Sequence, residues 1–187
     1  MNTTFKKSLL LLVMIVSIVA CGGKQEGSNT DSSDQETGGK SKHKNEKIAV
    51  NKTAKVFAIG KGEADVKVTS VTMDFFPEGK VVLLGDDKQV VRFELEITNN
   101  NDDEFSFNNT TLRLNTNTEK DKTLAIIINK SNANDILESA KIAKGKSIKG
   151  AMYYEVPTSV TLKDMTLVFK GYDEKMQAKN IEIPFAQ

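Results

Sequence analysis

Apolar and polar side chains alternate with a period of two along most of the chain beyond its first quarter. Val91, Phe93, Leu95 and Ile97 alternate with charged residues, and a similar pattern ends the chain at 181–185. Because successive side chains of a β-strand point to opposite faces, this pattern predicts strands with one buried and one hydrated face. The body of the protein is therefore predicted to be all-β.

Turn-forming clusters of Gly, Asn, Asp and Pro separate the alternating runs. The apolar parity changes near Ser70, which predicts a bulge, and the almost wholly apolar Leu124–Ile128 is predicted to be a central strand buried on both faces. Seven or more short strands at this spacing predict an antiparallel β-sandwich. The predicted strands lie at Val66–Met73, Val91–Ile97, Thr110–Thr116, Leu124–Asn129, Ile148–Tyr154, Met165–Tyr172 and Ile181–Phe185.

The segment Asn134–Lys144 is compatible with two structures. Asn134 is suited to cap a short helix that ends at Gly145 and carries Ile136, Leu137 and Ala140 on one side. The same residues also suit an edge strand followed by a loop. The sequence leaves both alternatives open, and the predicted fold does not depend on the choice.

The first 20 residues have the features of a secretory signal peptide. Two lysines precede an uncharged apolar run, Ser8–Ala20, which is too short to span ~30 Å of hydrocarbon. Residues 18–21, Ile-Val-Ala-Cys, resemble a bacterial lipobox, in which the thiol of the cysteine receives a diacylglyceryl group and the cysteine becomes the new N-terminus. Cys21 is therefore the predicted lipidation site, in preference to a plain signal peptide or a transmembrane anchor, and two acyl chains give stable anchoring.

A polar tether is predicted to follow from Cys21 through residue 46. From Gly22 onward it contains no aliphatic or aromatic residue, so it cannot bury enough surface to offset chain entropy. About 25 such residues span ~25–30 Å. The sandwich domain is predicted to occupy residues 47–187. With Cys21 the only cysteine of the chain, the domain contains no disulfide.

The charge balance argues against nucleic acid as a partner. The chain has 26 Lys and Arg residues against 25 Asp and Glu residues, a net charge of +1. Cleavage after residue 20 removes Lys6 and Lys7 and changes the net charge to about −1. The predicted location is the outer face of the cytoplasmic membrane of a bacterium, with the lipid on Cys21 as the membrane contact.

The sequence predicts no catalytic, cofactor-binding or metal-ligating set of residues. The only histidine, His43, falls in the tether, which holds no co-ligands in place. Serine and lysine lie close in sequence at Ser139 with Lys141 and at Ser147 with Lys149, but such near neighbours on a strand do not face each other.

The loop Asn99–Glu104 is rich in oxygen ligands of the kind that Ca²⁺ prefers. Its spacing does not match an EF-hand loop, and Asn and Asp also favour hairpin turns, in which they form Asx-turns. The turn is the preferred interpretation, and calcium binding is the alternative.

Three stretches resemble a family of bacterial lipoproteins with an immunoglobulin-like domain of unknown function, similar to the mycobacterial secreted immunoprotective antigen. VVRFELEITNNNDDEFSF (Val90–Phe107) resembles the long central strand and following turn, and KGKSIKGAMYYEVP (Lys144–Pro157) resembles the Gly turn, strand and terminal Val-Pro. MTLVFKG matches a late strand. The family usually has Pro-Gly-Glu where this chain has Lys-Gly-Lys at 144–146. The resemblance implies an immunoglobulin-like sandwich and no catalytic residue.

These observations favour a non-enzymatic binding or interaction module of the cell envelope, whose partner is an envelope protein or ligand. The loops Asp74–Gly79, Asn99–Glu104 and Asn129–Asn134 are the candidate binding surfaces. An envelope enzyme with an unrecognised pair of carboxylates is one alternative. A peptide pheromone released from the signal peptide is another.

Overall fold

The computed structural model describes residues 44–57, 63–77, 83–125, 128–129, 131, 133–172, 175 and 177–186. The predicted signal peptide, Cys21, His43 and the tether up to residue 43 lie outside the described residues. The first strand begins at Glu46, one residue before the predicted domain boundary.

Strands and two short 3-10 turns make up the regular structure of the described residues. Their order is β1 (Glu46–Phe57), β2 (Glu63–Met73), β3 (Lys88–Asn99), β4 (Phe105–Phe107), η1 (Asn109–Thr111), β5 (Leu112–Asn115), β6 (Ala140–Ile142), β7 (Ser147–Pro157), η2 (Leu162–Asp164), β8 (Thr166–Tyr172) and β9 (Ala178–Pro184). Within these residues no helix is long and apolar enough to cross a membrane.

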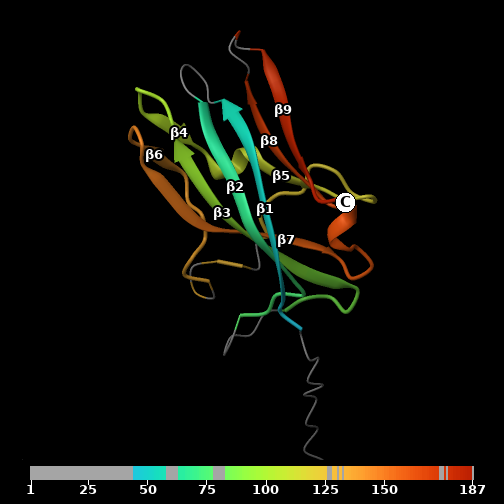
Figure 1. Cartoon of the computed structure of the whole chain (residues 1–187). Coiled ribbons are helices and arrows are strands. Elements are labelled where there is room, and N and C mark those ends of the chain that lie inside the picture. The colour runs from blue at the N-terminus through green and yellow to red at the C-terminus, as the bar shows by residue number, and fades with distance from the viewer. Residues whose placement is uncertain are drawn as a thin grey trace, which may run out of the picture. The chain divides into compact units, whose positions relative to one another are not determined.

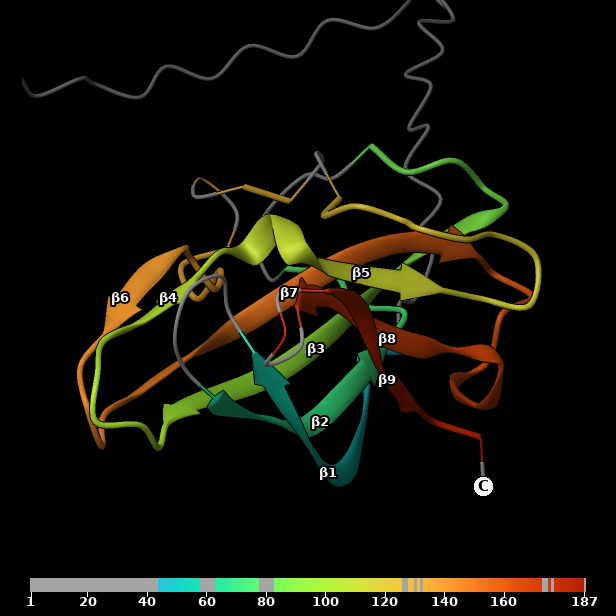
Figure 2. The same ribbon diagram turned by 90° about the horizontal axis from the view of Figure 1, so that it is seen from above.

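The strands form an antiparallel β-sandwich, as predicted. One sheet has the strand order β1-β2-β3-β7, a second has the order β5-β8-β9, and β4 pairs with β6 (Figures 1 and 2). Because β1 and β3 are both antiparallel to β2, they run in the same direction. The starts of β1 and β3 therefore lie at one end of the sandwich, and Asn99 lies at the other.

The core lies between the two larger sheets. The four alternating apolar residues of β3 are all buried, which confirms the predicted one-sided strand. They pack with residues from the facing sheet, among them Leu112, Leu167 and Ile183. Burial of this interface, at about 25 cal/mol per Å² of apolar surface, is the main stabilising contribution available to a domain without a disulfide.

The predicted bulge near Ser70 is present. Val68 pairs with Leu95, and Ser70 pairs with the next residue, Glu94, so Thr69 is the extra residue of β2. The bulge restores the inward direction of the apolar side chains, because Val71 is buried on the opposite sequence parity from Val68.

The prediction of a central strand at Leu124–Ile128 is wrong for the part that the structure describes. Leu124, Ala125 and Ile128 belong to no strand, while the two isoleucines at 126–127 lie outside the described residues. Ala125 instead lies at the free edge of β7, where its N donates to Tyr153 O at 2.8 Å. A second apolar cluster forms there, with Val90, Ala125, Ile128, Ala133, Ala151 and Tyr153. An apolar run indicates that its residues are buried. It does not distinguish a central strand from a loop that packs against a sheet.

The ambiguous segment that begins at Asn134 contains a strand and no helix. Ala140–Ile142 forms β6, so the alternative of an edge strand with a loop is confirmed. Before it, Leu137 N donates to Ala151 O at 2.9 Å, which attaches the chain to β7. Gly150 permits this approach, because a Cβ at that position would lie 2.8 Å from Leu137 Cα and 2.9 Å from Asp135 O.

The predicted strand Thr110–Thr116 is shorter than expected. Its first residues belong to the 3-10 turn η1, and β5 begins only at Leu112. The side chain of Asn108 caps this turn by accepting a hydrogen bond from Thr110 N at 3.0 Å. Side-chain capping competes with strand pairing for the backbone N–H groups, and at Thr110 the hydrogen bond to Asn108 replaces strand pairing.

Candidate functional site

Two cavities lie on either side of residues 44–48, which include the first residues of β1. Lys44, Glu46 and Ile48 line one cavity, and Asn45 and Lys47 line the other. This division follows from extended backbone, in which successive side chains point to opposite sides. Both cavities are therefore at the end of the domain where the predicted tether joins it.

The larger cavity, here called the tether-side groove, has a volume of about 890 Å³. Apolar side chains contribute to it, and its charged side chains are of both signs. Beneath it, the buried Gln89 amide donates to Val160 O at 2.9 Å and accepts from Asp74 N at 3.2 Å. The apolar residues of the groove are Ile48, Met73, Leu84, Val160 and Leu162.

The second cavity, here called the Arg92 pocket, has a volume of about 560 Å³. Its residues come from the start of β1, from β2 and the connection that follows it, and from β3 and β7. The others are residues 131 and 133–135, here called the covering segment, which lies against β7. The side chains that define it are Lys47, Phe75, Phe76, Arg92, Glu94, Asp135 and Tyr153.

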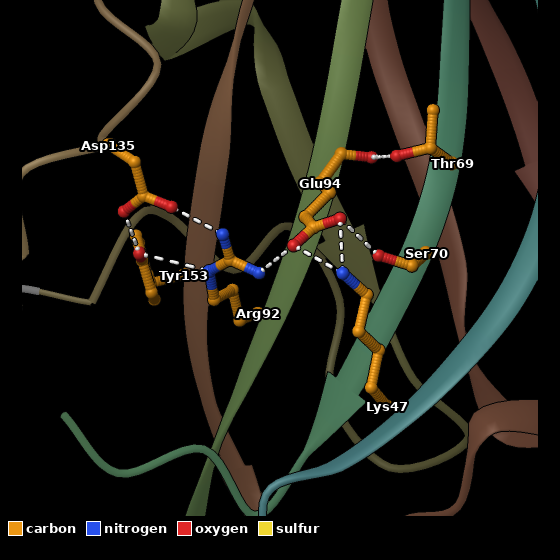
Figure 3. Close-up of polar contacts among 7 residues, drawn as sticks. All are labelled: Lys47, Thr69, Ser70, Arg92, Glu94, Asp135 and Tyr153. Carbon is orange, nitrogen blue, oxygen red and sulfur yellow. Dashed lines mark hydrogen bonds and ion pairs between the residues drawn. The ribbon is translucent and has the colours of Figure 1, made fainter. Parts of the chain in front are cut away.

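Arg92 is the centre of this pocket and contacts a partner on each side. Its guanidinium pairs with Asp135 at one end and with Glu94 at the other, and its Nε donates to Tyr153 Oη at 3.2 Å (Figure 3). Tyr153 Oη in turn donates to Asp135. The Arg92 guanidinium also lies over the Phe75 ring, 5.8 Å from its centroid, and the Phe75 and Tyr153 rings are 5.3 Å apart.

Glu94 connects this network of hydrogen bonds and ion pairs to β1, on the other side of β2. Lys47 Nζ donates to Glu94 Oε1 at 2.9 Å, and Ser70 Oγ donates to Glu94 Oε2 at 2.6 Å. Ser70 is the residue beyond the bulge, so the predicted irregularity of β2 directs this hydroxyl toward Glu94. Asp135, Arg92, Glu94 and Lys47 thus form a row of alternating charge, from the covering segment to β1 (Figure 3).

The network keeps both carboxyl groups ionised. Partial burial alone would raise the pKa of Glu94, but the hydrogen bonds from Ser70, Arg92 and Lys47 outweigh it and lower the pKa from 4.5 to about 2. Burial opposes ionisation of Asp135 as well, yet Arg92 and Tyr153 lower its pKa. Burial and the Asp135 carboxylate raise the pKa of Tyr153, so this hydroxyl stays protonated.

Two carboxylates therefore converge on one cavity, as the enzyme alternative requires, but their pKa values shift in the same direction. General acid–base pairs need one carboxyl group that retains its proton near neutral pH. Glu94 and Asp135 are both stabilised as anions by the same arginine. The arrangement is suited to holding these charges in place.

Two of the three predicted binding loops meet at the Arg92 pocket. Residues 75–77 of the first and residues 131, 133 and 134 of the third line it. The loop Asn99–Glu104 lies at the other end of β3 and forms the expected Asx-turn: Asn99 Oδ1 accepts from Asn101 N at 2.9 Å, while the Asn99 amide donates to Ile142 O at 2.8 Å. In the described part of the chain, no three His, Cys, Asp or Glu residues are placed to hold a metal ion.

The serine and lysine neighbours do not come together. Ser139 Oγ contacts the side chains of Asn108 and Asn109, whereas Lys141 pairs with Glu104 at 3.0 Å. The other two residues likewise have separate partners. Ser147 Oγ lies 2.8 Å from Thr98 Oγ1, and Lys149 pairs with Glu96 at 3.2 Å.

No local pattern in the sequence marks Lys47, Asp135 or Tyr153 as members of a site. The one available signal was the rarity of arginine, because Arg92 and Arg113 are the only two in the chain. An arginine on the polar face of a long strand, two residues from Glu94 on the same face, indicates an ion pair between the two side chains.

Comparison with known proteins gives a family match and similar folds. A family model described as a domain of unknown function, DUF4352, matches residues 48–180. The yjhA protein of Bacillus subtilis has a similar structure, with a TM-score of 0.54 and 17% identity over 73% of this chain and 97% of that one. None of the curated proteins matches the chain.

A second similar structure is ycdA of Bacillus subtilis strain 168, described as a candidate lipoprotein. Its TM-score is 0.50, with 16% identity over 75% of this chain and 40% of that one. At these identities the likeness shows a shared fold. The more specific relation to immunoglobulin-like domains and to the mycobacterial antigen stays a prediction.

Proposed function

The chain belongs to the DUF4352 family, and we propose that it is a lipid-anchored, non-enzymatic binding module on the outer face of the cytoplasmic membrane of a bacterium. Its immunoglobulin-like character is part of the same proposal. The observation that carries it is the position of the two cavities, which flank the segment where the predicted tether enters the domain.

The sequence supports the anchor independently of the domain. The lipobox ends at Cys21, and the tether after it is polar and free of aliphatic and aromatic residues. The fold also occurs in ycdA, which is described as a candidate lipoprotein. A tether of ~25–30 Å keeps the cavities close to the membrane surface, so their partner is a molecule of the inner cell envelope.

The ionisation of the pocket favours binding over catalysis. Arg92 holds Glu94 and Asp135 as carboxylates, and the partners of Arg92 are themselves held by Ser70 and Tyr153. Such preorganised charges bind a complementary partner with little ordering cost. They do not supply the proton donor that hydrolysis by a carboxyl pair requires.

The experiment is photo-crosslinking in intact cells. A photoreactive amino acid replaces Phe76 at the rim of the Arg92 pocket, and the matched control replaces Lys141, which is exposed on β6 and lines neither cavity. We expect adducts at position 76, found by mass spectrometry of the peptide that contains it, and none at position 141. The same background adducts at both positions would overturn the proposal.

A further inference from the structure

We propose that the Arg92 pocket binds a short dipolar ligand, with an ammonium group at one end and a carboxylate at the other, as a free short peptide presents them. This inference rests on the proposed binding function and names the class of ligand. It assigns the ligand carboxylate to Lys47 and the ligand ammonium group to Asp135.

The row of four charged groups ends in two groups of opposite sign. Arg92 and Glu94, in the middle, neutralise each other and are mostly buried. The side chains at the ends remain accessible, since Lys47 is 58% exposed and Asp135 is 44% exposed. The pocket therefore has no net charge and presents a positive end at β1 and a negative end at the covering segment.

Charge complementarity selects a ligand with two charges. A simple anion would be attracted to Lys47 and repelled by Glu94 and Asp135, and a simple cation would meet the opposite arrangement. A dipolar ligand is attracted at both ends, and its own net charge of zero matches that of the pocket. Repulsion of the wrong partners gives specificity as effectively as attraction of the right one.

The end groups also have unused capacity for hydrogen bonds. The Lys47 ammonium has three donors, and in the network it donates to the Glu94 carboxylate. The Asp135 carboxylate accepts from Arg92 and Tyr153 with one oxygen each, and a carboxylate offers about four lone-pair positions. Both groups can add a ligand without losing the contacts that hold them.

The size and walls of the cavity suit a small peptide. Its volume of about 560 Å³ is within the range of small-molecule sites, roughly 300–1,000 Å³. Phe75 and Phe76 form an apolar side of the pocket, against which the uncharged middle of a ligand can pack. Phe75 is fixed by its contacts with Tyr153 and Arg92, so the surface exists before a ligand arrives.

The test is a calorimetric titration of the full chain, purified from membranes in detergent, with three probes. The probes are triglycine, N-acetyl-triglycine, which lacks the ammonium group, and triglycine amide, which lacks the carboxylate. We expect triglycine to bind about tenfold more tightly than either capped peptide, with an affinity that falls as salt is added. Equal binding of all three, or no heat from triglycine at about 10 mM, overturns the inference.

Two variants assign the ends of the ligand. Lys47→Gln should weaken triglycine to the level of triglycine amide and leave the amide unchanged, because the partner of the carboxylate is lost. Asp135→Asn should weaken triglycine to the level of N-acetyl-triglycine and leave the binding of N-acetyl-triglycine unchanged, because the partner of the ammonium group is lost. Lys141→Gln, which removes an exposed ion pair with Glu104 outside the pocket, is the control and should change nothing.

A loss of folding will not be mistaken for a loss of binding, because Lys47 is exposed and a thermal melt checks that each variant is folded. If Lys47→Gln weakens all three probes equally, the assignment of the carboxylate end is overturned. Specific adducts at position 76 in cells, together with no binding of triglycine, would overturn the ligand class while leaving the proposed function intact.

Discussion

Asn45 and Phe76 hold each other through two hydrogen bonds. Phe76 N donates to Asn45 Oδ1 at 2.7 Å, and Asn45 Nδ2 donates to Phe76 O at 3.3 Å. Next to them, Lys44 N donates to Asp74 Oδ2 at 2.8 Å. These bonds attach the first residues of the domain to the connection between β2 and β3, which forms one wall of the Arg92 pocket.

Replacement of Asn45 by glycine should lower the free energy of unfolding by about 1 kcal/mol. Asn45 has a φ of 45°, which glycine adopts freely, so the change removes the hydrogen bonds and leaves the backbone conformation accessible. Asn51→Gly is the matched control, because Asn51 has a φ of 47° and an exposed side chain on β1, the strand that Asn45 precedes. Urea unfolding measures both, and an equal effect of the two changes would contradict the role of the bonds.

The adjacent tyrosines of β7 should respond in opposite ways to removal of their hydroxyl groups. Tyr154 Oη is fully buried in the core and contacts no hydrogen-bond partner among the described residues. Tyr154→Phe should therefore be neutral or stabilise by about 1 kcal/mol. Tyr153→Phe should destabilise by about 1–2 kcal/mol, because Asp135 and Arg92 lose a partner. Denaturant unfolding of both variants measures the two changes in the free energy of unfolding. A change of the same sign in both would refute the prediction.

Arg92→Met should cost about 3 kcal/mol of stability. The change keeps most of the side-chain volume and leaves Glu94 and Asp135 without the cation between them. Lys149→Met breaks an exposed ion pair with Glu96 and should cost less than about 1 kcal/mol. Urea unfolding measures both losses of stability, and equal losses would contradict the structural role of Arg92.

Stability should decrease in acid because the pKa of Glu94 is lowered on folding from 4.5 to about 2. A carboxyl group of this kind stabilises the fold fully above its unfolded pKa. The contribution is lost as the pH falls from about 4.5 toward 2, since the unfolded chain then binds a proton that the folded chain does not. Ser70→Ala removes one of the donors and should raise the pKa of Glu94, which carboxyl chemical shifts would follow. An unchanged titration would show that Ser70 has no part in the shift.

Cys21→Ser should abolish membrane retention and leave the fold intact. The predicted diacylglyceryl group is the only strong membrane affinity of the mature chain, because the tether is polar and the net charge is near zero. The described domain begins well beyond this residue. Cell fractionation with labelled palmitate checks both forms, and absence of label on the unaltered protein would refute the lipoprotein assignment.

The strands that could be predicted are those whose pattern is local. The alternation at Val91–Ile97 and the change of parity at Ser70 appear in the structure as β3 and as the bulge of β2. Local patterns suffice there because burial on one face acts on every second side chain of a strand. Leu124–Ile128 shows the limit, since its apolar composition reports burial and not the geometry of the buried chain.

Local sequence patterns do not predict the candidate site. Alternation assigns Arg92 and Glu94 to a polar face, but it does not say that Lys47 lies beside Glu94 or that Asp135 reaches Arg92. Those contacts depend on the register of β1 against β2 and β3, and on the covering segment that Gly150 admits against β7.

The strand periodicity, the bulge and the predicted lipidation at Cys21 can all be read from the sequence, because each depends on neighbouring residues. The absence of disulfides follows from the single cysteine of the chain. The tertiary structure alone decided that Lys47, Arg92 and Asp135, which are far apart along the chain, share one cavity. The physical reason is that ion pairing acts between side chains over a few ångströms of space, whatever their separation in sequence.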